Sequence, residues 1–60
     1  MKTFNTEDSA VAYMRAINKA RQKAGNGDIV VVVDGPEEAT WSVMELKEAV
    51  ENGFFYRWEI

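Results

Sequence analysis

The residues best suited to chemistry in this chain are the carboxylates that follow its most apolar segment. Asp34 comes directly after the run from Ile29 to Val33, and Glu37, Glu38 and Glu45 follow it. Such carboxylates are ligands for a hard cation such as Mg²⁺, and open α/β sheets place ligands at the carboxyl ends of their strands. Asp before Gly is also an ordinary turn pair whose carboxylate accepts backbone hydrogen bonds. We therefore expect no metal, no cofactor and no catalytic residue, and a magnesium-dependent enzyme built on Asp34 is only the third functional hypothesis.

Other features also argue against enzymatic activity. The loop Gly25-Asn26-Gly27 follows a predicted helix and precedes a strand, whereas a phosphate-binding loop follows a strand and opens a helix. Gly35-Pro36 does follow a strand, but acidic residues surround it and would repel a phosphate. The chain has no His and no Cys, so the usual general bases and nucleophiles are missing. We predict that it is not an enzyme.

Four basic residues are candidates for contacts with nucleic acid. Arg15, Lys19 and Lys23 recur at four-residue spacing and would share one helix face, with Arg21 beside them. Binding to a nucleic-acid backbone usually involves several neutralised phosphates and a basic domain, whereas this chain has a net charge of -3. A solvated helix face, or an internal match to the acidic second half, is the more ordinary interpretation. Nucleic acid is thus a disfavoured partner, and a nucleic-acid-associated regulator is the alternative function.

Aromatic residues are concentrated at the end of the chain. The sequence has seven aromatics, and four of them lie in the last seven positions. Tyr and Trp contribute much of the binding energy at protein interfaces, and a patch of them left in water is a liability. We assign Trp41, Phe55, Tyr56 and Trp58 as protein-binding residues. The competing interpretation is that they close the core.

Hydrophobic periodicity predicts the elements that position these residues. Residues 2–4 form a short strand, and a helix capped by Thr6 continues to Gly25, with apolar residues recurring at three- and four-residue spacing. The β-branched run 29–33 predicts a central buried strand. Ser42 and Glu45 have the spacing of a capping box, which predicts a second helix over 43–52, and residues 54–60 alternate as a terminal strand.

The predicted fold class is therefore α/β, a two-layer β-α-β-α-β mini-domain. Right-handed crossovers would make its three-stranded sheet largely parallel, with both helices on one face and the other face uncovered. A 60-residue chain forms one domain, residues 1–60, with a small core. Because neither a disulfide nor a His/Cys zinc site can staple it, oligomerisation is the remaining means of support.

Charge and hydropathy set the expected surroundings. Residues 1–26 hold five basic and two acidic residues, whereas residues 27–60 hold two basic and eight acidic residues, so the chain is bipolar. The longest apolar run is far shorter than the ~20 residues that cross a bilayer, and the acidic start lacks the apolar core of a secretory signal. We expect a cytoplasmic protein with no membrane partner.

The second half of the chain carries a resemblance. The stretch from Asp34-Gly35-Pro36-Glu37 to Trp58-Glu59 resembles small uncharacterised α/β proteins encoded by phages and prophages. The matching positions between these ends are Trp41, Val43, Leu46, Ala49, Glu51, Gly53, Phe54 and Tyr56. This resemblance implies an accessory factor in the host cytoplasm that binds a host or phage protein. It covers under half of the chain and includes no catalytic motif.

Our first hypothesis is a non-enzymatic protein-protein interaction module. It would act as a homodimer or bind another protein through the uncovered sheet face and the C-terminal aromatics.

Overall fold

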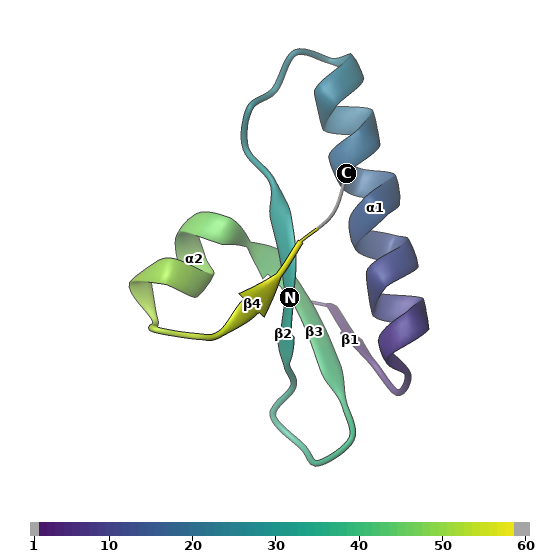
Figure 1. Cartoon of the computed structure of the whole chain (residues 1–60), viewed down its shortest axis with the longest axis vertical. Helices are drawn as coiled ribbons and strands as arrows, with labels where there is room; N and C mark the ends of the chain where they lie inside the picture. Colours follow the sequence, from purple (N-terminus) through teal and green to yellow (C-terminus); the bar gives the residue numbers. More distant parts are fainter. Residues whose placement is uncertain (1, 59–60) are drawn as a thin grey trace.

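The computed structural model describes residues 2–58, which form a four-stranded sheet between two helices (Figure 1). In chain order the elements are β1 (Lys2–Phe4), α1 (Glu7–Lys23), β2 (Val30–Asp34), β3 (Trp41–Glu45), α2 (Leu46–Glu51) and β4 (Tyr56–Arg57). The strand order is β1-β3-β2-β4, and every neighbouring pair is antiparallel. The prediction of a three-stranded, largely parallel sheet is therefore wrong.

The error arose at residues 42–45, where the capping-box spacing predicted Ser42 as the cap of a second helix over 43–52. Residues 42–45 belong to β3, which returns along β2 so that Val33 lies opposite Ser42 and Val31 lies opposite Met44. Gly35 N–H donates to Thr40 O at 2.9 Å and closes the hairpin. Pairing with the valine strand buries Ser42, Val43 and Met44. This long-range burial outweighs a local capping signal, and α2 begins only at Leu46.

The valine strand is confirmed as an interior strand, and it builds two cores. Alternate residues of a strand point to opposite faces of the sheet. On one face Val30 and Val32 pack with Val43 of β3 and with Ala10 and Met14 of α1. On the other face Val31 and Val33 pack with Met44 and with Ala49 of α2.

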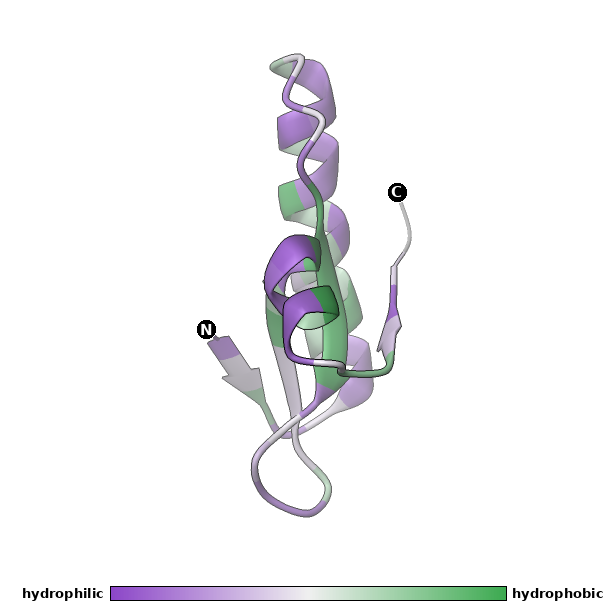
Figure 2. Cartoon of the chain, turned by 90° about the vertical axis from the view of Figure 1, so that its left-hand side faces the viewer, coloured by the Kyte–Doolittle hydropathy of each residue, from purple (hydrophilic) through white to green (hydrophobic). Residues whose placement is uncertain are grey.

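The two helices thus lie on opposite faces of the sheet, with α2 in front and α1 behind in Figure 2. The expectation of two helices on one face, with the other face uncovered, is wrong. The helices lie on opposite faces because β2 and β3 form a hairpin, and this hairpin replaces the helical crossover that would have put α2 beside α1. The domain has three layers.

Helix α1 follows its predicted signals. Thr6 has an extended backbone, and its hydroxyl accepts from Ser9 N–H at 3.2 Å, as an N-cap does. Beyond the last turn Gly25 has a φ of 76°, and Asn26 N–H donates back to Arg21 O at 2.9 Å. The left-handed glycine therefore ends the helix as expected.

Asn18 connects α1 to the first residue of β2 in a way that the sequence did not indicate. Its side chain is 2% exposed, its Nδ2 donates to Val30 O at 3.0 Å, and its Oδ1 accepts from Val30 N–H at 2.8 Å. The amide thus satisfies both backbone groups of a buried strand residue, as a neighbouring strand would.

The terminal strand is shorter than predicted, because β4 contains only Tyr56 and Arg57. The predicted strand residues 59 and 60 lie outside the described residues. Within residues 2–58, no helix is long and apolar enough to cross a membrane.

Candidate protein-binding surface

The C-terminal aromatics reach the sheet through a tight turn after α2. Gly53 has a φ of 71°, which favours glycine, and Phe54 N–H donates to Ala49 O at 3.0 Å. The chain then pairs with β2, with Tyr56 opposite Val33 and Arg57 opposite Val32. This pairing makes β4 one edge of the sheet, on the right in Figure 2.

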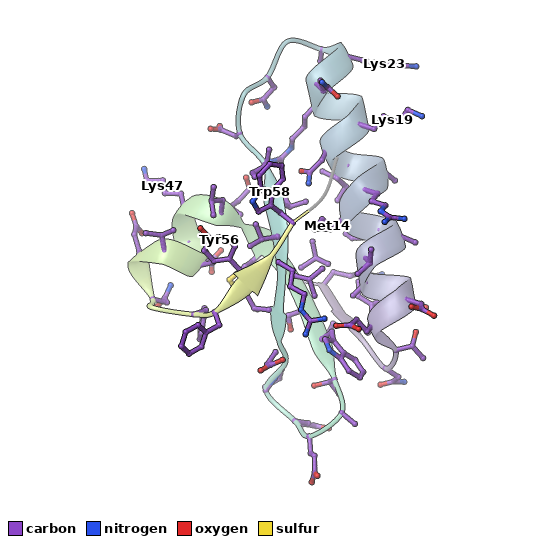
Figure 3. All side chains as sticks on the ribbon, viewed as in Figure 1. Met14, Lys19, Lys23, Lys47, Tyr56 and Trp58 are labelled. Carbon is purple, nitrogen blue, oxygen red and sulfur yellow. The ribbon has the colours of Figure 1, made fainter. Side chains whose placement is uncertain are left out.

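The aromatic residues of this segment are exposed, Phe55 almost completely and the other three by a little under half. Phe55 is 96% exposed, and Phe54, Tyr56 and Trp58 are 45%, 43% and 48% exposed. We call these four residues the C-terminal aromatic segment. In Figure 3 the labelled Tyr56 side chain lies on the α2 side of β4, and that of Trp58 lies further along the chain. These side chains stay outside both cores.

Trp41 has a different environment from the other predicted binding residues. It is half-buried and packs on the α1-side core together with Phe4, so most of its ring serves packing. It also lines a shallow depression of about 90 Å³ that Phe55 and Tyr56 border. The structure therefore brings Trp41, Phe55 and Tyr56 to one depression, which Trp58 does not line.

An ion pair fixes the direction of the only charge on β4. Arg57 Nη1 contacts Glu7 Oε2 in the first turn of α1. Arg57 lies opposite Val32 and so shares the α1 face of the sheet, whereas Tyr56 lies opposite Val33 on the α2 face. The cationic side chain is thus turned toward α1 rather than along the open edge.

The acidic residues do not form the cation site that their sequence proximity suggests. Asp34 pairs with Trp41 at one end of the hairpin, and Glu45 pairs with Val30 at the other. Four residues of strand at ~3.4 Å each separate the two ends. Within residues 2–58 no group of three or more acidic residues is placed to hold a metal ion. The expectation that a ligand binds at the carboxyl end of the valine strand also fails, because that rule concerns parallel sheets and every strand pair here is antiparallel.

Glu45 instead forms a bidentate ion pair with Arg21. Arg21 Nη1 and Nη2 donate to Glu45 Oε1 and Oε2 at 2.7 Å and 2.8 Å. These hydrogen bonds from Arg21 hold the pKa of Glu45 below its ordinary value, although partial burial opposes the shift. The pair connects α1 to the end of β3.

The predicted basic stripe is only partly available for a ligand. Arg15, Lys19 and Lys23 lie on the exposed side of α1, and the labelled lysines extend away from the sheet in Figure 3. Arg21 is withdrawn from this group by its bond to Glu45. Lys19 and Lys23 remain exposed, on a chain of net charge -3.

Phe54 belongs to the exposed aromatic segment but was not among the predicted binding residues. Phe54 is nearly as exposed as Trp58, although the alternating pattern had only placed it on the same strand face as Tyr56. The signal that was present, aromatic density after Gly53, covers Phe54 as well. Exposure itself could not be read from the pattern, because it depends on where α2 ends over the sheet.

Comparison of the chain with models of protein families, with curated proteins and with solved structures finds no match.

Proposed function

We propose that this chain is a non-enzymatic protein-binding module whose C-terminal aromatic segment contacts a partner protein. The observation that supports this proposal is Phe55, which is 96% exposed and is flanked by three aromatics exposed by more than two fifths. Burying one such ring in an interface yields ~1.5–3 kcal/mol relative to leaving it in water. Aromatic anchors of this kind are typical of the centres of protein interfaces.

The resemblance to phage and prophage proteins is part of this proposal. It suggests that the partner is a host or phage protein, or a second copy of the chain, in the cytoplasm of a bacterial host. The nucleic-acid alternative has less support, since Arg21 is bound to Glu45 and the net charge is negative.

A photocrosslinking experiment tests the proposal. A photoreactive phenylalanine analogue replaces Phe55 in the full chain, and the matched control carries it at Lys23, an exposed position at the end of α1. Both variants are irradiated in a bacterial cytosol after circular dichroism has shown that they fold. We expect discrete adducts from position 55 and none from position 23.

The mass of an adduct distinguishes the partners. An adduct of two chains or an adduct with a heavier protein both support the proposal. The absence of any discrete adduct at position 55, or equal labelling from both positions, would refute it.

A further inference from the structure

The outer edge of β4 has backbone groups that no described strand pairs. Leu46 N–H donates to Ile29 O, so these two opposed residues form a hydrogen-bonded pair. Such pairs alternate along an antiparallel ladder, so Val31 and Val33 also bond to β3, whereas Val32 turns its N–H and C=O toward Arg57 of β4. Tyr56, one residue earlier, therefore directs its N–H and C=O away from the sheet.

Trp58 follows β4 with the same parity as Tyr56, so extending the strand by one residue would direct its N–H and C=O outward as well. Strand order places β4 at the edge, and no backbone bond among residues 2–58 reaches its outer side. Proteins usually protect such an edge with lysine, proline or a bulge. The opposite edge, β1, carries Lys2, but β4 carries only Arg57, whose charge is turned to Glu7.

The exposed aromatic area at this edge is close to what a small dimer requires. With aromatic side chains of ~200 Å² each, the exposed fractions of the four residues amount to roughly 450–500 Å². This is about a ninth of the total accessible surface of 4282 Å². An interface typically covers about a tenth of the surface of a small protein, and two such patches together approach the ~1,000 Å² expected of a specific contact.

We propose that the partner of the C-terminal aromatic segment is a second copy of this chain, joined through β4. This inference rests on the proposed function and names its partner. The two β4 edges pair antiparallel about a two-fold axis, so that one sheet runs through both protomers. Tyr56 bonds to Trp58 of the second copy, and Trp58 bonds to Tyr56 of the second copy. The same patch serves both protomers, as a two-fold interface requires.

This register explains why aromatics flank Arg57. Tyr56 and Trp58 of the second copy become a directly opposed cross-strand pair on the α2 face, where aromatic pairs stabilise a sheet. On the α1 face the two Arg57 residues lie opposite each other. Glu7 of each protomer neutralises its own arginine and so removes a like-charge repulsion.

Sedimentation equilibrium of the purified full chain over a wide concentration range is the test. We expect a reversible monomer–dimer equilibrium. Tyr56→Pro removes an N–H that the protomer itself does not use, and proline is tolerated on edge strands. This variant should raise the dimer dissociation constant by about tenfold or more, the effect of one or two net hydrogen bonds with their aromatic contact. Glu7→Gln should weaken the dimer at low salt and less so at high salt.

Val50→Ser is the matched control, because Val50 is 59% exposed on α2 and lines a pocket with Ile29 and Leu46, separate from the depression that Phe55 and Tyr56 border. It should leave the dissociation constant unchanged. Amide exchange of wild type gives a readout without mutation, since the Tyr56 and Trp58 amides should be protected more strongly as concentration rises.

Three outcomes would overturn the inference. These are a wild-type chain that stays monomeric at every concentration, equal weakening by Val50→Ser and Tyr56→Pro, and concentration-independent exchange at Tyr56 and Trp58. A monomer that still crosslinks to a heavier protein from position 55 would overturn the dimer and leave the proposed function standing.

Discussion

Asn18 is expected to contribute more stability than any other polar side chain in this fold. Asn18→Ala would leave Val30 N–H and Val30 O buried with no partner, although both now have bonds of 2.8–3.0 Å to the amide. A buried backbone group that loses its partner costs ~1–3 kcal/mol, so we expect a loss of ~2–4 kcal/mol. At ~4–8 °C per kcal/mol, the melting temperature should fall by about 8–32 °C.

Urea denaturation followed by tryptophan fluorescence measures this loss at low temperature. Asn52→Ala is the control, because it removes an amide that donates to Glu48 O at an exposed helix end. That replacement should change the free energy of unfolding by less than ~0.5 kcal/mol, as surface substitutions usually do. If Asn18→Ala were equally mild, the argument that its amide acts as a substitute strand would be wrong.

Asn18→Asp tests the two hydrogen bonds separately, because it keeps the acceptor for Val30 N–H and removes the donor to Val30 O. A carboxylate at this position still accepts from Val30 N–H but repels Val30 O, and burial raises the pKa of the introduced acid above that in the unfolded chain. The folded state then binds the proton more tightly, so the destabilisation should shrink as pH falls through that pKa. A pH-independent loss would contradict the proposed geometry.

Three further predictions concern the hairpin, the ion pair and the basic helix. Gly35→Ala should destabilise the fold by ~1–3 kcal/mol, because the added Cβ would clash with Thr40 Oγ1 and lie 2.9 Å from the Thr40 backbone carbon. Gly27→Ala is the control: its added Cβ meets nothing within 4 Å, so the melting temperature should stay the same or rise slightly. Glu45→Gln should cost ~0.5–1 kcal/mol at neutral pH, discounted for the partial exposure of the pair with Arg21. Because the pKa of Glu45 is lower in the folded protein, this stabilisation is present above its unfolded pKa and is lost as pH falls through its folded pKa. The free energies of unfolding of the wild type and Glu45→Gln should therefore converge in acid. Anisotropy titrations with labelled duplex DNA at low salt should show no saturable binding, and tight, salt-steep binding that Lys19→Gln weakens would instead support the nucleic-acid alternative.

The sequence correctly predicted the elements that depend mainly on interactions between residues close together in the chain. Thr6 caps α1, Gly25 ends it, and the valine run forms an interior strand, because capping, left-handed backbone and β-branched packing are short-range effects. A terminal strand was predicted over 54–60, whereas among the described residues of this segment only Tyr56 and Arg57 pair.

Residues 41–46 show where such signals fail. Ser42 and Glu45 read as a capping box, but Ser42 is 1% exposed within β3, and Glu45 binds Arg21 from a helix 24 positions away. Both outcomes depend on pairing with β2 and on packing against α1, which no local spacing encodes. The same applies to Asn18, whose helix position gives no sign that its amide meets Val30.

For this protein the sequence alone determined which residues are helical in the first half and which strand is interior. The tertiary structure decided the hairpin, the antiparallel sheet, the opposite placement of the helices and the exposure of Phe55. The reason is physical. Periodicity reports which face of an element is apolar, but an uninterrupted valine strand has two apolar faces, and only long-range pairing decides what covers each one.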